Sequence, residues 1–231
     1  AVRNDTISDR RVCVLIIGES SRYDRWQING YNRVTSPRLA ARKDLLTFSD
    51  VVAGAHYTWV SVPQLITRAH PDNYNIQYRE KSLLGAFKEA GFNTYWLSNQ
   101  SDQDIFWTGT ITLHAKTADF YSFSPSYSPN MEYETIHDGR LLPLVDSVLK
   151  ADKNDLFIVL HTMGSHWNYS QRYPPEFDVF RPSGYTEDLN PPGPSKREAL
   201  LNSYDKHLGE HPQRARRGLF SRPSLQQVMD Y

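Results

Sequence analysis

Residues 12–22 of this 231-residue chain read VCVLIIGESSR, and they decide its fold. The first six form a continuous apolar run, which is typical of a parallel strand covered on both faces. Gly18 ends the run, and the carboxylate of Glu19 follows it at once. We therefore expect a central buried strand over Val12–Ile17 with a polar group at its carboxyl end. Cys13, inside the run, is expected to be a small buried apolar residue.

A second run of this kind, DLFIVL, occupies residues 155–160. Apolar periodicity and end signals predict further elements between and around the two runs. These are helices beginning at Ser36–Pro37 and spanning Lys81–Ala90 and His137–Lys150, and strands at Leu46–Val52 and Asn93–Leu97. Strands that alternate with helices predict an α/β fold, a mostly parallel central sheet with helices on both faces.

Composition narrows the function classes. Lys plus Arg and Asp plus Glu number 26 each, so the net charge is zero and nothing global favours nucleic acid or an acidic membrane surface. The single cysteine excludes a disulfide within the chain. No stretch reaches the roughly 18 consecutive apolar residues of a membrane span, and no signal peptide is visible.

Two strand ends carry groups suited to chemistry, because ligands of open α/β sheets bind beyond the carboxyl ends of the strands. Glu19 could bind a divalent cation there, and a helix-capping or surface role fits its position equally well. Residues 161–166 read HTMGSH and place two imidazoles after the second run. His161, still on the strand, is better explained as a buried, hydrogen-bonded histidine. His166, beyond the glycine, is a candidate for binding zinc or phosphate.

Thr58 precedes a predicted helix in the segment TWVSVP, residues 58–63. Its simplest role is that of an N-cap. A hydroxyl at a helix N-terminus also lies where backbone N–H groups and the helix dipole favour a phosphate. A threonine becomes a useful nucleophile when a nearby metal lowers the pKa of its hydroxyl.

Taken in order, these segments resemble the phosphoethanolamine transferases of the sulfatase and alkaline phosphatase superfamily. The resemblance covers about residues 10–205. It rests on VLIIGESSR at 14–22, NGYNRVTSP at 29–37, TWVSVP at 58–63, WLSNQSD at 96–102, LHTMGSHW at 160–167 with RYP at 172–174, and LNSYD at 201–205. It implies an alkaline-phosphatase-like or sulfatase-like α/β fold.

The resemblance also implies roles for single residues. Thr58 would be the catalytic nucleophile that carries phosphoethanolamine, and Glu19 and Thr58 would bind zinc or another divalent metal. His166, Gln100 and Asn99 would bind the substrate. The donor would be phosphatidylethanolamine, and the acceptor lipid A or the lipopolysaccharide core. The reaction would take place at the periplasmic face of the bacterial inner membrane, with an anchor expected upstream of this chain.

The resemblance predicts domain boundaries and departures. Residues 1–10 would be a leader or linker, residues 11–205 the N-terminal part of the catalytic domain, and residues 206–231 an atypical, poorly ordered tail. The family's Asp-His-Gly motif, which supplies further zinc ligands, does not follow Asp205. The fold is therefore expected to be incomplete at its carboxyl end, the metal incompletely coordinated and catalysis impaired, unless His207, His211 or Asp230 completes the site.

Two rival interpretations remain. A sulfatase or phosphatase on the same fold would transfer the group to water, although such sulfatases use a modified Cys or Ser in a Cys/Ser-x-Pro-x-Arg setting that Thr58 lacks. A non-catalytic fragment would bind its ligand weakly or not at all, since fold does not fix function. Zinc content and turnover separate the three.

Overall fold

The computed structural model describes residues 10–102, 109–124, 137–189 and 192–207. The chain divides into two compact units. Unit 1 comprises Ala1–Ile17, Val51–Glu134 and Asp138–Thr162, and unit 2 comprises Gly18–Asp50, Thr135–His137 and Met163–Tyr231. Of the predicted leader at residues 1–10 and the predicted tail at residues 206–231, residues 1–9 and 208–231 lie outside the described residues. Lys206 and His207, placed in that tail, are the last residues of a helix over Arg197–His207, and Lys206 is buried.

Unit 1 is built on a parallel sheet whose described strands run in the order β1-β4-β2-β3. These are β1 (Val12–Ile17), β2 (Asn93–Ser101), β3 (Phe120–Ser124) and β4 (Leu156–His161). Leu156, the first residue of β4, is paired with Val12 on one side and with Asn93 on the other. The parallel α/β sheet predicted from the sequence is confirmed.

The predicted position of the first strand is wrong. The strand β4 has neighbours on both sides and is buried along its whole length. The strand β1 lies at the edge of the described sheet, and Ile17 is its one buried residue. Cys13 is accordingly half-buried and packs against the core. The two apolar runs have similar compositions, and composition does not reveal which run receives a strand on each side.

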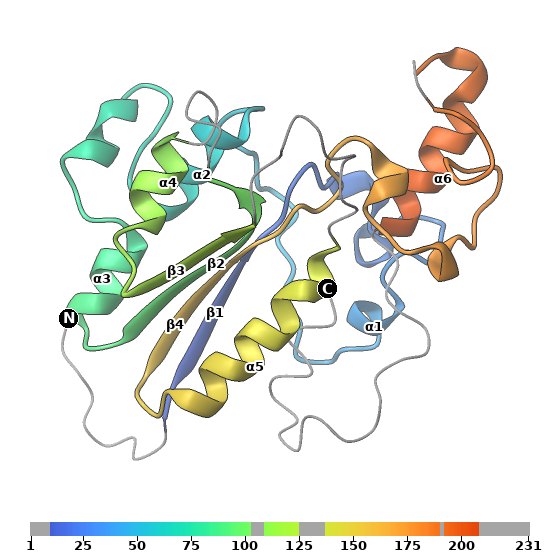
Figure 1. Ribbon diagram of the computed structural model, residues 1–231. Coiled ribbons are helices and arrows are strands. Elements are labelled where there is room, and N and C mark those ends of the chain that lie inside the picture. The colour runs from blue at the N-terminus through green and yellow to red at the C-terminus, as the bar shows by residue number, and fades with distance from the viewer. Residues whose placement is uncertain (1–9, 103–108, 125–136, 190–191, 208–231) are drawn as a thin grey trace, which may run out of the picture. The chain divides into compact units, whose positions relative to one another are not determined.

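Helices cover both faces of the sheet in unit 1. They are α2 (Thr58–Ile66), α3 (Leu83–Glu89), α4 (Gly109–Ala115) and α5 (Leu141–Ala151), with 3-10 turns at Tyr74–Tyr78 and Asp138–Arg140. Helix α5 runs across one face (Figure 1). The helices α2, α3 and α4 lie against the other face of the sheet. They place Val62, Leu84 and Ile111 in a core cluster with side chains of that face.

Aromatic packing dominates that core cluster. Trp96 of β2 is fully buried, and the ring of Phe157 stacks on Phe87 with centroids 4.0 Å apart. Burying a side chain of the size of Phe157 stabilises the fold by roughly 1.5 to 3 kcal/mol. The predicted helix that presents Phe87 begins after its N-cap Ser82, and Gly91 follows it with a φ of +85°. Gly91 therefore ends the helix as predicted, whereas the helix begins after Ser82 rather than at Lys81.

One predicted strand is absent. Residues 46–52 form no strand, and Leu46, Phe48, Val51 and Val52 are all exposed. An apolar run indicates that a segment could pair, but it does not provide the partner. Helix α4 was not predicted, because its sequence GTITLHA is rich in residues that favour strands. Packing against α2 overrides that weak local preference.

Unit 2 consists of short helical turns held by polar contacts. They are 3-10 turns at Tyr23–Arg25, Gln27–Asn29, Tyr169–Gln171, Pro175–Phe177 and Pro194–Lys196, with α1 (Pro37–Ala40) and α6 (Arg197–His207). The side chains of Lys206 and Asp178 form a fully buried ion pair. Removal of either partner would leave an uncompensated buried charge and would strongly destabilise the fold.

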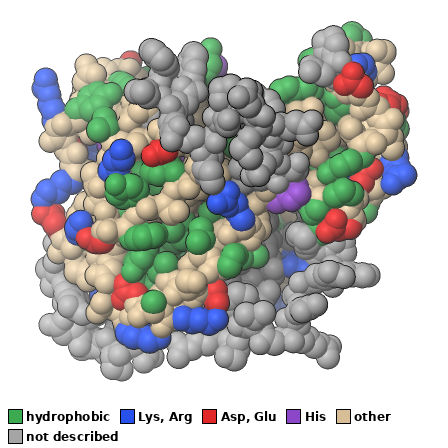
Figure 2. Space-filling view, in the orientation of Figure 1, with side chains coloured by type: hydrophobic (Ala, Val, Ile, Leu, Met, Phe, Trp, Pro, Cys, Tyr) green, Lys and Arg blue, Asp and Glu red, His purple; other side chains and the backbone are tan. Residues whose placement is uncertain are grey.

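The surface shows no strong charge bias on the face seen in Figure 2. Lys and Arg side chains lie among Asp and Glu side chains there. Across residues 10–102, 109–124, 137–189 and 192–207, no helix has the length and apolar character needed to cross a membrane.

Asp152, just after α5, provides a test of acid stability. Burial by itself would raise the pKa of Asp152, but hydrogen bonds from Asn93, Asn154 and Tyr95 outweigh it and lower the pKa to about 2. A lowered folded-state pKa stabilises the protein above the unfolded pKa of about 3.9, and this contribution is lost as the pH falls through the folded value. We expect Asp152→Asn to reduce the stability by about 1 kcal/mol at pH 7, after allowance for solvent screening, and by much less at pH 2, where the native carboxyl is partly protonated. Urea denaturation at several pH values measures this, and an equal loss at both pH values would contradict it.

Candidate functional site

Glu19 begins a tight turn in unit 2 that directly follows β1 in the sequence. Its side chain is partly exposed, and the Ser20 hydroxyl donates a 2.7 Å hydrogen bond to its Oε1. Ser20 has a φ of +53°, in the left-handed region that residues with side chains seldom adopt. Such backbone strain persists where surrounding groups hold it.

Several groups hold this turn. The Ser165 N–H donates a 2.8 Å hydrogen bond to the carbonyl oxygen of Glu19. Gly164, with a φ of +49°, lies so close to Glu19 that an added Cβ would be 2.5 Å from its carbonyl oxygen and 2.7 Å from its nitrogen. A glycine is required there for two reasons, its φ and the close approach of the Glu19 backbone. The glycine before His166 therefore positions Glu19.

Thr58 is the first residue of α2 in unit 1, and the N-cap is Tyr57. The N-cap role considered for Thr58 is therefore wrong. The carbonyl oxygen of Tyr57 accepts hydrogen bonds from Val60 and Ser61 at 3.0 and 2.9 Å. The partly exposed Thr58 side chain thus lies in the first turn of a nine-residue helix, where the helix dipole favours an anion.

Gln100 lies near the carboxyl end of β2 and His161 at the carboxyl end of β4, both in unit 1. Gln100 is partly exposed, and its Nε2 donates to the carbonyl oxygen of Thr162 at 2.9 Å. Asn99 is fully buried and donates to Asp138 at 2.7 Å. His161 is buried, with its Nδ1 3.3 Å from the Ser98 hydroxyl, as expected for a structural histidine. Of the predicted substrate-binding pair, Gln100 is the more accessible.

His166 is exposed in unit 2, as predicted. Its Nδ1 lies 2.6 Å from the carbonyl oxygen of Trp167, and its own carbonyl oxygen accepts from the buried Arg172 at 3.0 Å. These two contacts hold the His166 imidazole in place at the surface. His166 and Glu19 belong to unit 2, and Thr58 and Gln100 belong to unit 1. That the four share one site stays a prediction.

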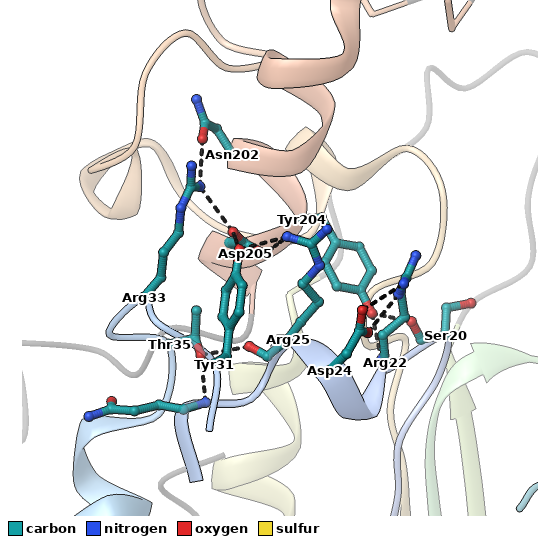
Figure 3. Close-up of polar contacts among 11 residues, drawn as sticks. Ser20, Arg22, Asp24, Arg25, Tyr31, Arg33, Thr35, Asn202, Tyr204 and Asp205 are labelled. Atoms are coloured by element: carbon teal, nitrogen blue, oxygen red, sulfur yellow. Dashed lines mark hydrogen bonds and ion pairs between the residues drawn. The ribbon is translucent and has the colours of Figure 1, made fainter. Parts of the chain in front are cut away.

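Helix α6 connects to the Glu19 turn and to the loop after it, all within unit 2 (Figure 3). The Tyr204 hydroxyl donates to the carbonyl oxygen of Ser20 and accepts from the Arg22 N–H, both at 2.6 Å. The next residue, Asp205, is fully buried and accepts from Tyr31 at 2.7 Å and Arg33 at 3.0 Å. Sequence analysis missed Tyr204, because no local pattern reveals a contact across 184 residues.

The donor chemistry of Glu19 fits a divalent cation, since hard cations prefer carboxylate oxygens. A zinc ion usually has at least three protein ligands. Within the described ranges, no group of three or more His, Cys, Asp or Glu side chains could hold a metal ion.

Comparison with known proteins gives a consistent result. Residues 11–211 match the sulfatase family. The chain is 30% identical over 211 residues to phosphoethanolamine transferase EptC of Escherichia coli, covering 89% of this chain and 35% of that protein. It spans about a third of the length of the curated relatives it matches.

Solved structures agree with the sequence match. The C-terminal periplasmic domain of EptC from Escherichia coli, in complex with zinc, superposes with a TM-score of 0.74 at 27% identity, covering 89% of this chain and 57% of that one. The soluble domain of lipooligosaccharide phosphoethanolamine transferase A from Neisseria meningitidis gives a TM-score of 0.70 at 30% identity, covering 90% of this chain and 60% of that one. The predicted alkaline-phosphatase-like fold is confirmed.

Proposed function

Because this chain belongs to the sulfatase family, we propose that it acts in the transfer of phosphoethanolamine from phosphatidylethanolamine to a hydroxyl of a bacterial envelope acceptor, lipid A or the lipopolysaccharide core. The observation that carries the proposal is the similarity of some nine-tenths of the chain to proteins named phosphoethanolamine transferases. The family match spans Glu19, Thr58, Gln100 and His166.

We assign the nucleophile to Thr58. Its hydroxyl oxygen would attack the phosphorus of the donor, forming an Oγ1–P bond while the bond from phosphorus to the diacylglycerol oxygen breaks. The hydroxyl proton would end on the departing diacylglycerol. An acceptor hydroxyl would then attack the same phosphorus, the Oγ1–P bond would break, and the proton of the acceptor hydroxyl would end on Thr58 Oγ1. The position of Thr58 in the first turn of α2 supports this, because that turn favours a phosphate anion.

Glu19 and Thr58 would hold a zinc ion, which would lower the pKa of the Thr58 hydroxyl when bound. Support comes from the zinc complex of the similar periplasmic domain. We assign binding of the donor phosphate or headgroup to His166 and Gln100, whose side chains are both accessible. Asn99, also assigned to substrate binding, is buried and donates a hydrogen bond to Asp138. We propose that the reaction takes place at the periplasmic face of the inner membrane. Support comes from two similar structures, one of a periplasmic domain and one of an integral membrane protein.

The proposal is tested by trapping the intermediate. The purified protein is incubated with phosphatidylethanolamine vesicles and zinc, quenched in acid, digested and mapped by mass spectrometry. We expect phosphoethanolamine on the peptide that contains Thr58, and its loss when a sugar acceptor with free hydroxyls is added. Release of phosphoethanolamine to water at the same rate without an acceptor would favour the hydrolase. No adduct on Thr58 in the presence of zinc and turnover would refute the assignment.

A further inference from the structure

The turn at Glu19 contains a residue in an unfavourable backbone conformation. Glu19 is followed by Ser20 in the left-handed region, and a serine has no intrinsic preference for that conformation. A carboxylate on a turn that relaxes to another conformation points elsewhere. Some group outside the turn therefore has to hold it.

The structure shows which group satisfies the turn. The Tyr204 hydroxyl lies between the carbonyl oxygen of Ser20 and the N–H of Arg22, with both hydrogen bonds at 2.6 Å. A phenol has one hydrogen to donate and lone pairs to accept with, so a single oxygen closes both bonds. Ser21, between the two, is held separately by the Trp26 indole N–H at 2.8 Å. The backbone from Ser20 to Arg22 is thereby fixed at both ends.

Tyr204 is itself rigidly placed. Its side chain is 5% exposed and its ring meets Tyr169 edge to face at 5.2 Å. Its neighbour Asp205 is fixed by Tyr31 and Arg33, so α6 cannot shift without breaking the buried network in Figure 3. Burial raises the pKa of the Tyr204 hydroxyl, which therefore keeps its proton at neutral pH.

We propose that Tyr204 is a positioning residue for Glu19, holding the left-handed turn so that the Glu19 carboxylate is oriented for a divalent cation. This inference rests on the proposed function, which makes Glu19 a metal ligand. The Ser165 N–H and Gly164 constrain Glu19 from its other side, so the carboxylate is oriented by contacts from two distant segments. Groups that orient a metal ligand govern affinity without touching the metal.

The test compares Tyr204→Phe with a matched control, Tyr185→Phe. The Tyr185 hydroxyl also donates a 2.6 Å hydrogen bond to a backbone carbonyl, that of Tyr173, away from Glu19. Zinc affinity is measured on the purified protein by competition with a chromophoric chelator, with Glu19→Gln alongside. The exchange rate of the Arg22 amide is measured by NMR without metal. Thermal melting shows that each variant is folded.

For Tyr204→Phe we expect faster exchange of the Arg22 amide and a loss of zinc affinity of about 10- to 100-fold. Tyr185→Phe removes one hydrogen bond of a 41% exposed side chain, and it should lower the melting temperature less and change neither quantity. Gly164→Ala reaches the same turn from the other side, since its Cβ would displace Glu19, and it should also weaken zinc binding. It measures how strongly zinc binding depends on the position of the Glu19 backbone.

Two contrary results are distinguishable. If Glu19→Gln weakens zinc binding while a folded Tyr204→Phe does not, Tyr204 has only a structural role and the proposed function stands, whatever Gly164→Ala does. If Glu19→Gln binds zinc as tightly as the unaltered protein, the metal site is wrong, and this inference fails with it.

Discussion

Replacing Thr58 by alanine is expected to lower kcat for headgroup transfer by on the order of a thousandfold or more, because the change removes the oxygen that would carry the phosphoethanolamine. The fold should survive. Thr58 is the first residue of α2 and not its N-cap, and alanine is the best helix former. The loss is therefore expected in kcat, with the melting temperature nearly unchanged.

Two further variants make the result specific. Thr58→Ser keeps a hydroxyl at the same place and should retain measurable turnover. Ser61→Ala removes a hydroxyl one turn further along the same helix, and kcat should stay within a few-fold of its original value. Rates are measured with labelled phosphatidylethanolamine in vesicles and a sugar acceptor. Transfer by Thr58→Ala at the rate of Thr58→Ser would show that another group is the nucleophile.

Breaking the buried pair of Lys206 and Asp178 should have the largest effect on stability. The two side chains are 0% and 3% exposed, so Lys206→Met leaves a carboxylate buried without its main counter-charge. Loss of one partner of a buried pair costs about 3 to 5 kcal/mol. Arg181 also contacts Asp178 but is 68% exposed, and Arg181→Met should cost less than about 1 kcal/mol.

The double variant separates charge from packing. Lys206→Met combined with Asp178→Leu removes both charges, and we expect it to be more stable than Lys206→Met alone, since an apolar pair of similar volume replaces a buried ion pair well. Urea denaturation of the two single variants and the double variant measures this. If Lys206→Met costs no more than Arg181→Met, the pair contributes little to folding.

Local signals in the sequence predicted individual elements better than their arrangement. Ser82 and Gly91 mark the two ends of α3, and the apolar run at residues 156–160 forms β4. These features depend on neighbouring residues alone. The central place of β4 depends on strands far away in the chain, and the exposure of Leu46–Val52 depends on the lack of a partner strand among the described residues. No local sequence pattern indicates either the central place of β4 or this exposure.

The predictions about the candidate site show the same difference between local features and long-range contacts. The exposure of His166 and the burial of His161 follow from their positions relative to the strand and to Gly164, and both were predicted. The role of Gly164 against Glu19 and the contact of Tyr204 with Ser20 join residues more than 140 positions apart. Sequence spacing gives no signal for such contacts, although the left-handed backbone they support is visible once the structure is known.

The pairing of β1 with β4 has a consequence during synthesis of the chain. Arg11 and Asp155, joined by hydrogen bonds where the two strands begin, are 144 residues apart. At a translation rate of about 5 to 20 residues per second, the apolar run at residues 12–17 would wait roughly 7 to 30 s for the strand beside it. Throughout that time an unpaired, strongly apolar segment is open to aggregation and to chaperones. Chaperones in the compartment where the chain folds should therefore engage this run early and release it only after β4 has emerged.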